Sequence, residues 1–484
     1  MTGSSRRLVA GIDSSTQATK VVVCDADTGE ALREARMAHP EATEVDPGHW
    51  WNALEAATAH DFLDGVVAVG VAGQQHGMIA LDEEGRVVRP AMLWNDVRSA
   101  ESAQELVTEL GGPSAWVAAV GSVPVAAFTV TKLRWLAEHE PESAERVCEV
   151  VLPHDWVTAR LLGADTVKPG TAVTDRGDAS GTGYWSPSSG SYRSDLIELA
   201  LGKAFSPPKV LGPAESVGET PDGRLVSLGS GDNMAAALGL GIDTGDIVVS
   251  LGTSGTAFGV HQSPVADVTG AVAGFADATG RYLPLVCTLN AARVLIAAAN
   301  MLGTDLAGLQ RLALESVPGA GGLVLLPYLD GERTPDLPFA TGTVGGITRH
   351  NATPPNLARA AVEGMLCGLA DGVDALRSQG VEVRRIFLIG GAARSEAVQR
   401  VASDLFGVTV VVPAAGEYVA LGAARQAAWA LAARGNADTG LPQWPRTGDV
   451  TLEPDDRHLG DVVRKNYRRF REVVHPSTTV GDSG

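Results

Sequence analysis

The stretch GSGDNMAAALGLG, residues 229–241, lies near the middle of this chain of 484 residues. The apolar residues 225–228 before it predict a short strand, the glycines end that strand, and Asp232 opens a helix rich in alanine and leucine. A carboxylate at this position can be the N-cap of the helix, because it accepts amide hydrogens that the first turn leaves unpaired. It can also face a ligand. The ligand-binding interpretation gains support from the position of Asp232 near the middle of the chain, because each half of the chain contains one polar turn rich in small hydroxyl residues, and the two turns resemble each other.

The composition is that of a globular protein, with 45% hydrophobic residues and 57 glycines. The length allows three domains or two large ones. A net charge of -19 argues against nucleic acid or an anionic membrane as a partner. A polyanionic substrate such as ATP would therefore need cations close to its phosphates.

The cysteines have neither the spacing of a zinc site nor that of a disulfide framework, and they indicate a reducing compartment. They are Cys24, Cys148, Cys287 and Cys367. The apolar run after Arg7 is interrupted by Asp13, which makes it too short for a signal peptide. No stretch of 18 uncharged apolar residues follows. We therefore expect a soluble, cytoplasmic protein.

The first polar turn joins two predicted strands, residues 8–12 and 20–24. Its hydroxyls and successive amides can cradle a phosphate. Asp13 can hold Mg²⁺ through water molecules, and Lys20 can neutralise a terminal phosphoryl group. The alternative is an ordinary hairpin with a polar turn.

The second polar turn repeats this pattern, with strands at 247–251 and 257–260 around Gly252-Thr253-Ser254-Gly255-Thr256. Repetition at this scale indicates a duplicated fold. We expect two halves that face each other across a cleft, each giving one loop to the same phosphates, as in the actin-like ATPases.

Two polar clusters follow predicted strands in the first half. Gln74, Gln75 and His76 come directly after the strand at 66–71, and Trp94-Asn95-Asp96 follows the next apolar run. Ligands often bind at such strand ends. Amide, imidazole and carboxylate groups can bind the hydroxyls of a polyhydroxyl ligand, while an indole face covers its carbons. A structural role for the histidine is the alternative.

Other segments are predicted to be structural, or contain residue types that do not point to one particular chemical role. His154-Asp155-Trp156 and the small-residue loop at 174–182 belong to the second group. Arg333, in the polar loop 330–335, is expected to be structural, and 356–378 to be a long scaffold helix. The segment 445–484 ends in a Ser/Thr/Gly tail that is expected to fray.

At this point the motifs resemble one family over residues 8–429. They occur in the order GIDSSTQATK, GQQHG, LWND, DASGT, GDN, SLGTSGT, LPYLDGERTP and IGGAARS, which is the order found in carbohydrate kinases of the FGGY family. The resemblance implies an α/β fold of two actin-like (ribonuclease H-like) ATPase domains, with ATP and a sugar between them. It places an N-terminal domain with the sugar site at 1–241 and a C-terminal domain with the adenosine site at 242–484.

The resemblance also implies roles for individual residues. The metal residue would be Asp13, the catalytic base Asp232, and the phosphate contacts Thr16, Lys20, Gly252 and Thr253. The sugar would contact Gln75, His76, Trp94, Asp232 and Asn233, and the adenosine would border Gly390, Gly391 and Ala392. The helix around 420–422 would close the adenosine side.

Three positions depart from the usual family pattern. Glycine is usual where Ser15 and Ala392 stand, and methionine is frequent where Gln75 stands. Ser15 and Ala392 add side chains where the backbone approaches the nucleotide, so they bear on loop geometry and ATP affinity. Gln75 bears on the identity of the sugar.

The implied reaction is in-line transfer of the γ-phosphoryl group of ATP to a ketopentose hydroxyl, by resemblance the 5-hydroxyl of D-xylulose, with Mg²⁺ as cofactor. A kinase of ribulose, glycerol or gluconate is the main alternative. An actin-like filament or chaperone ATPase would not need the sugar clusters, and a silent sugar-binding regulator would not need Asp232. A homodimer is left open.

Overall fold

The computed structural model describes residues 6–436 and 439–476, which group into two compact units. Unit 1 contains Met1–Ile242, Val260–Pro284 and Ala415–Arg446, and unit 2 contains Asp243–Gly259, Leu285–Ala414 and Thr447–Gly484. The first division lies within one residue of the predicted boundary at 241/242. Two later segments, however, group by contact with unit 1.

The sheet of unit 1 is built from a three-stranded meander followed by parallel strands. Its order is β13-β14-β5-β1-β2-β3, with β15 also paired to β5. The bounds are β1 Leu8–Ser14, β2 Ala18–Asp25, β3 Ala31–Ala38, β5 Val66–Gly73, β13 Ser216–Glu219, β14 Leu225–Ser227 and β15 Ser230–Gly231. Strands β1, β2 and β3 form an antiparallel meander, whereas β5 and β14 run parallel to β1 and extend the sheet.

The strands of unit 2 repeat this arrangement in the order β19-β17-β16-β22-β23-β24. The bounds are β16 Asp246–Leu251, β17 Gly255–Gly259, β19 Tyr282–Thr288, β22 Arg385–Ile389, β23 Thr409–Val412 and β24 Val450–Leu452. Strands β19, β17 and β16 form the antiparallel meander, and β22 and β23 continue it in parallel. The duplication predicted from the two polar turns is confirmed.

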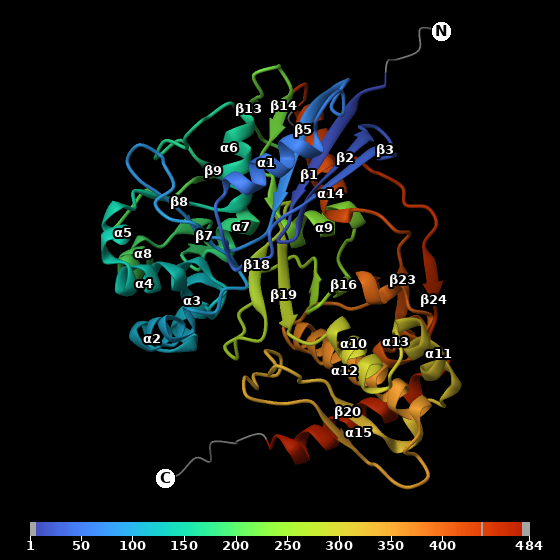
Figure 1. The fold of residues 1–484 in the computed structure, drawn as a ribbon. Helices are drawn as coiled ribbons and strands as arrows, with labels where there is room; N and C mark the ends of the chain where they lie inside the picture. The colour runs from blue at the N-terminus through green and yellow to red at the C-terminus, as the bar shows by residue number, and fades with distance from the viewer. Residues whose placement is uncertain (1–5, 437–438, 477–484) are drawn as a thin grey trace, which may run out of the picture. The chain divides into compact units, whose positions relative to one another are not determined.

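Helix α14 (Tyr418–Ala433) comes from the second half of the sequence but belongs to unit 1. Figure 1 shows it beside β1 and β5. Its contacts are made backbone to backbone: a Cβ on Gly11 would lie 1.8 Å from the carbonyl oxygen of Ala420, and one on Gly422 would lie 1.8 Å from that of Ala235 in α9 (Asp232–Leu240). Glycine is therefore required where this helix crosses its neighbours.

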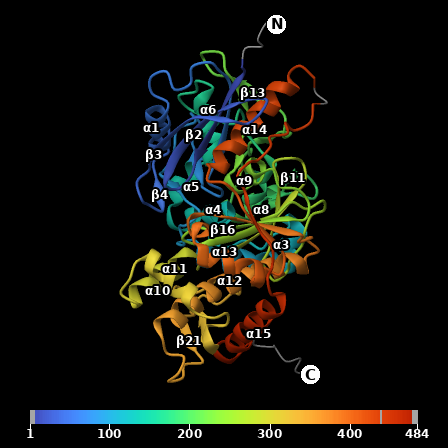
Figure 2. The ribbon, with the colours of Figure 1, turned by 90° about the vertical axis from the view of Figure 1, so that its right-hand side faces the viewer.

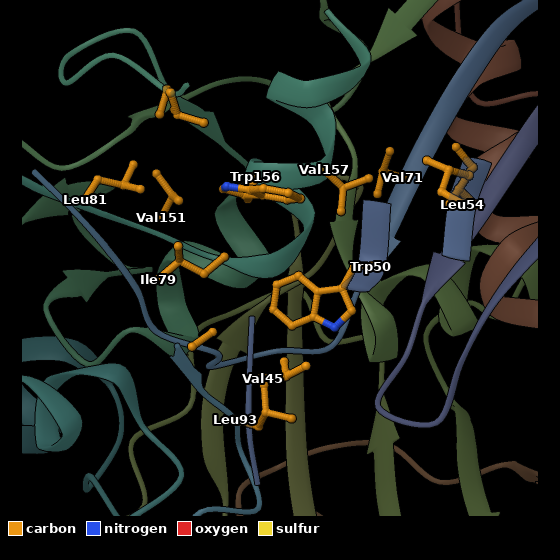
Figure 3. Packing of buried hydrophobic residues seen from close by; sticks show 14 of the residues in the cluster. Val45, Trp50, Leu54, Val71, Ile79, Leu81, Leu93, Val151, Trp156 and Val157 are labelled. Carbon is orange, nitrogen blue, oxygen red and sulfur yellow. The ribbon is translucent and has the colours of Figure 1, made fainter. Parts of the chain in front are cut away.

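The sheet of unit 1 is covered on one side by the hydrophobic cluster drawn in Figure 3. Trp50 of α1 and Trp156 of α6 meet edge to face, with ring centroids 6.4 Å apart, and both are at least nine-tenths buried. Trp50 and Leu54, predicted from helical spacing to be core residues, are confirmed as such. Burying two indole rings contributes several kcal/mol to this layer, about 25 cal/mol per Å² of apolar area.

The remaining elements of unit 1 are mostly short. The helices are α1 Gly48–Ala57, α2 Ala100–Leu110, α3 Pro113–Val120, α4 Thr129–His139, α5 Pro141–Arg146, α6 Pro153–Leu161, α7 Arg176–Gly181 and α8 Ser194–Leu201. The small strands are β4 Glu44–Val45, β6 Ile79–Leu81, β7 Ala91–Met92, β8 Glu149–Val151, β9 Val173–Thr174, β10 Trp185–Ser186, β11 Ser191–Tyr192, β12 Lys209–Val210 and β18 Ala273–Ala276.

Unit 2 is completed by longer helices, including one that the sequence did not reveal. Its helices are α10 Ala292–Met301, α11 Leu306–Glu315, α12 Pro354–Ser378, α13 Glu396–Phe406 and α15 Arg457–Val474, with β20 Val324–Leu326 and β21 Thr343–Gly345. Figure 2 shows α15 alongside α12. Asp371 and Asp374 of α12 pair with arginines of α15. The expected fraying of the end of the chain concerns 477–484, outside the described residues, but 457–474 are helical.

The described helices contain no single one with the length and apolar character needed to cross a membrane. Helices α10 and α11 reach that length and apolar character only when taken together, and the chain bends by 85° between them.

Candidate active site

Asp232 is the first residue of α9 and not its N-cap, which corrects the cap interpretation. Gly231 occupies the N-cap position with extended backbone angles, φ -64° and ψ 155°, and no side chain caps the helix. Asp232 Oδ1 instead accepts hydrogen bonds from the backbone N–H of Asn233 at 2.8 Å and from its side-chain Nδ2 at 2.9 Å. These bonds orient the carboxylate and leave its second oxygen for another group.

The environment of Asp232 adjusts its acidity to neutral pH. Burial, followed by the negative charge of Asp13, raises the pKa of Asp232 to about 7, and the hydrogen bonds from Asn233 oppose that rise only in part. A general base works best when its pKa is close to the operating pH. The desolvation effect therefore prevails over the helix N-terminus, a balance that the sequence did not decide.

Gln75 and Asn233 extend this hydrogen-bonded group. Asn233 Nδ2 donates to Gln75 Oε1 at 3.0 Å, although Gln75 and Asn233 are 158 positions apart. The Nε2 of Gln75 is buried without a hydrogen-bond partner. An unpaired buried amide is costly, so this N–H₂ group is a ready donor for a ligand oxygen.

His76 is held in an unusual conformation beside this amide. Its φ is +66°, a region that non-glycine residues rarely adopt, and its Nδ1 lies 2.7 Å from the carbonyl oxygen of Gly181. The imidazole stacks on Phe128 with ring centroids 5.0 Å apart and also meets Phe275. Backbone strain that surrounding contacts hold in place is typical of ligand sites.

The second polar cluster is only partly as expected. Trp94 is 36% exposed, and its Nε1 donates at 2.8 Å to Thr16 Oγ1 on the phosphate turn. Thr16 in turn donates to Gln74 at 3.2 Å. Asp96, however, is buried and forms an ion pair with Arg98 at 2.8 Å, so it is not an exposed ligand group. The Asp96 carboxylate instead stabilises the loop that contains residues 96–98, through its bonds to Arg98.

The first phosphate turn contains a buried acid and a lysine directly opposite each other in the β1–β2 ladder. Asp13 Oδ2 and Lys20 Nζ are 3.4 Å apart, and Lys20 also pairs with Glu417 at 2.8 Å. Burial works to lower the pKa of Lys20, but the two carboxylates outweigh it and raise that pKa, so the lysine stays charged. Ser15 Oγ donates to Asp13 Oδ1 and thus becomes part of the acid's hydrogen bonding.

Asp13 has the properties of a metal residue. Its side chain is 1% exposed, and Oδ2 accepts no hydrogen bond. Burial raises the pKa of Asp13, while the charge of Lys20 lowers it. A divalent cation would favour the ionised form further, and Mg²⁺ commonly binds through one or two carboxylates, water and substrate phosphates. The residues present therefore fit magnesium.

The second phosphate turn is tied to the start of α10. Backbone N–H groups of Ala291 and Ala292 donate to Thr253 and Gly252 at 3.3 and 2.9 Å. Arg293 Nε lies 3.4 Å from the carbonyl oxygen of Thr253, and Asp330 holds the same guanidinium at 2.8 Å. This arrangement places a cation and a helix N-terminus beside the turn, although its strands carry no charge at the positions equivalent to Asp13 and Lys20.

Two of the three predicted adenosine residues, Gly391 and Ala392, border a cavity of about 430 Å³ in unit 2. Its wall includes Leu295, Ile296, Leu309 and Val362, together with Gly391 and Ala392. A mostly apolar cavity of this size suits a flat aromatic base. Gly390 has φ +94°, and a Cβ there would lie 2.6 Å from the carbonyl oxygen of Leu251, beside the Thr253 turn. The structure thus brings these sequence-predicted residues of unit 2 together.

Three residues of unit 1 that the sequence left without a role also belong to the site. Glu417 pairs with Lys20, Asp178 lies behind Gly231, and His154 pairs with Asp178 and lies behind Gly229. The sequence signal for His154 and Asp178 was the HDW motif and the loop at 174–182, whereas no motif pointed to Glu417.

A meander extended by parallel strands, present twice and carrying one polar turn in each copy, defines the class of an actin-like ATPase. Residues 8–241 match the N-terminal domain, and 247–431 the C-terminal domain, of the FGGY family of carbohydrate kinases. The chain belongs to this family and is a carbohydrate kinase.

Among known relatives, a xylulose kinase of Streptomyces coelicolor is 46% identical over 480 residues, which cover 96% of both chains. The crystal structure of a xylulose kinase from Bifidobacterium adolescentis aligns with a TM-score of 0.88 and 44% identity, over 97% of this chain and all of the other. A gluconate kinase from Lactobacillus acidophilus aligns with a TM-score of 0.87 at 22% identity, over 98% and 99% of the two chains. Because the xylulose kinase and the gluconate kinase align almost equally well with this chain, the fold alone does not identify its sugar substrate.

Proposed function

We propose that this kinase phosphorylates D-xylulose to D-xylulose 5-phosphate with ATP. The observation that carries the proposal is the half-buried carboxylate of Asp232, whose pKa burial raises to about 7, and which accepts a hydrogen bond from the Asn233 amide that also donates to Gln75. The xylulose kinases that share more than 40% of this sequence support the choice of sugar. We place the reaction in the cytoplasm, where thiols such as the free Cys24 and Cys367 stay reduced.

In this proposal Asp232 acts as the general base. Its free oxygen accepts a hydrogen bond from the 5-hydroxyl and takes the proton as the sugar oxygen bonds to the γ-phosphorus. The bond between that phosphorus and the bridging oxygen breaks, and ADP leaves with the electron pair. Positioning and charge neutralisation provide most of the rate enhancement in such transfers.

The other residues bind and orient the reactants. Gln75 Nε2 and Asn233 would hydrogen-bond sugar hydroxyls, and the exposed indole of Trp94 would cover sugar carbons. Lys20 and the turn around Thr253 would bind ATP phosphates, with the adenosine against Gly390, Gly391 and Ala392. Asp13 would hold Mg²⁺, which offsets phosphate charge when bound.

A substrate panel tests the choice of sugar. D-Xylulose, D-ribulose, glycerol and gluconate are assayed for ADP release with Mg-ATP, each over a range that gives kcat and KM. We expect the highest kcat/KM with D-xylulose, because the neutral groups of Gln75, Asn233 and Trp94 suit hydroxyls better than a carboxylate. If another acceptor exceeded D-xylulose tenfold, the substrate proposal would be wrong while the kinase class would stand.

A further inference from the structure

His154 and Asp178 form a buried pair beneath the proposed base. His154 lies in α6 and Asp178 in α7, and both side chains are 0% exposed. His154 Nδ1 and Asp178 Oδ2 are 2.5 Å apart. On its other side, His154 Nε2 faces Asp155 at 3.2 Å and Asp175 at 3.9 Å. Four ionisable groups therefore share one enclosed space.

The spacing of this pair is that of a direct hydrogen bond and not that of two ligands of one metal ion. His154, Asp175 and Asp178 could be grouped as ligands by proximity alone. Two ligands of a zinc ion with bonds of about 2.0 Å, however, stand roughly 3.3 Å apart in a tetrahedron. His154 Nδ1 and Asp178 Oδ2 are instead within hydrogen-bond distance of each other.

Burial raises the pKa of each carboxyl group in this cluster, and most strongly that of Asp178. Burial raises the pKa of Asp155 to about 7 and that of Asp175 to about 6. Burial, followed by the charge of Asp232, raises the pKa of Asp178 well above its usual range. A neutral Asp178 does not repel the ionised form of Asp232, so the base can carry its charge close by.

Asp178 contacts the segment that leads into the base. A Cβ on Gly231 would lie 2.7 Å from Asp178 Oδ1 and 2.7 Å from Gln75 Cγ. Gly231 is the N-cap of α9, so its backbone sets where Asp232 begins. The oxygen Asp178 Oδ1 is buried without a hydrogen-bond partner, and it points to this junction.

The same short helix holds the sugar loop. Asp175 caps α7 by accepting hydrogen bonds from the backbone N–H groups of Gly177 and Asp178. At the other end of α7, the carbonyl oxygen of Gly181 lies 2.7 Å from His76 Nδ1. One six-residue helix thus touches both sides of the group formed by His76, Gln75 and Asp232.

We propose that Asp178, held by His154, is a positioning residue that fixes Gly231 and thereby the carboxylate of Asp232 for phosphoryl transfer. The proposal rests on the role of Asp232 as base in the proposed function. The proposal explains two motifs at once, because the HDW motif supplies His154 and the loop at 174–182 supplies Asp178.

Kinetics of paired variants test this role. We expect Asp178→Ala to lower kcat about 10- to 100-fold, because small displacements of a catalytic group have effects of that size. The sugar dissociation constant from calorimetry should stay within about threefold. Asp178→Asn keeps the shape and the bond to His154, and should stay within about threefold of wild type in kcat. Asp155→Asn is the matched control in the same cluster, since its bond to the backbone of Leu152 lies away from Gly231.

A double variant separates positioning from a general structural defect. If Asp178 acts through Asp232, then adding Asp178→Ala to Asp232→Asn should lower kcat by less than about twofold more. An equal further loss in that background, or wild-type kcat in Asp178→Ala alone, would overturn the proposal. If Asp232→Asn alone kept wild-type turnover, the base assignment itself would fail, which is a separate and distinguishable result.

Discussion

Replacing Asp232 by asparagine should remove activity and at the same time stabilise the fold above neutral pH. The amide keeps the hydrogen bonds with Asn233 and can still bind a sugar hydroxyl, but it cannot take the proton. Loss of a general base typically lowers kcat about 10²- to 10⁴-fold. Sugar affinity should change little.

The size of the stability gain follows from the pKa of Asp232. That pKa is about 7 in the folded chain, against a reference value of 3.8. Well below pH 3.8 the acid is protonated in both folded and unfolded chains, so it has no effect on the free energy of unfolding. Between pH 4 and 7 only the unfolded chain releases the proton, and the wild type loses stability as pH rises. Above pH 7 the loss is constant at roughly three pKa units, about 4 kcal/mol as an upper limit.

Denaturant unfolding of wild type and Asp232→Asn at pH 4.5 and at pH 8 measures this effect. We expect the variant to be more stable than wild type at pH 8, and the difference between the two midpoints to be much smaller at pH 4.5. Asp195→Asn is the control, because Asp195 is exposed and paired with Arg193, which lowers its pKa. Equal midpoints for Asp232→Asn and wild type at pH 8 would refute the raised pKa, and a kcat near wild type would remove Asp232 from the chemistry.

Two further results are expected. Asp13→Ala and Thr253→Val should each lower kcat/KM for Mg-ATP at least about tenfold with the fold intact, since each removes a proposed phosphate or metal contact; unchanged turnover in either would make the repeated turn merely structural. Gly422→Ala should destabilise the chain by about 1–3 kcal/mol or more in thermal unfolding, because the new methyl group has no room beside Ala235. Gly440→Ala, where nothing lies within 4 Å, should be silent, and equal effects of the two changes would refute this packing argument.

The duplicated sheet could be predicted from sequence because each hairpin is local: two apolar strands and the polar turn between them lie within about twenty residues. The helix at Asp232 was also predictable, but its exact start was not. Gly231 takes extended angles and becomes the N-cap itself, so the carboxylate moves one position into the helix. A single glycine decides that shift, and sequence patterns do not resolve it.

Contacts between distant segments could not be predicted. Asp96 looked like an exposed ligand group, yet it is buried against Arg98. The pairing of His154 with Asp178 joins residues 24 positions apart, and neither motif alone identifies its partner. Helix α15 was missed because its partners are distant in the sequence: Val463 and Tyr467 are buried, and its arginines pair with Asp371 and Asp374 of α12, about 90 to 100 positions earlier.

The origin of α14 limits how this chain can be divided. A fragment ending at Gly241 would contain β1, β5 and α9 but not the helix that lies over them, so apolar residues such as Val9 and Ala68 would meet water. Such a fragment should be insoluble when expressed alone, and recover its fold only when residues 415–446 are fused to it or supplied as a second peptide. Unit 1 can therefore complete its fold only after residues 415–446 have been synthesised, although most of its sequence precedes residue 243.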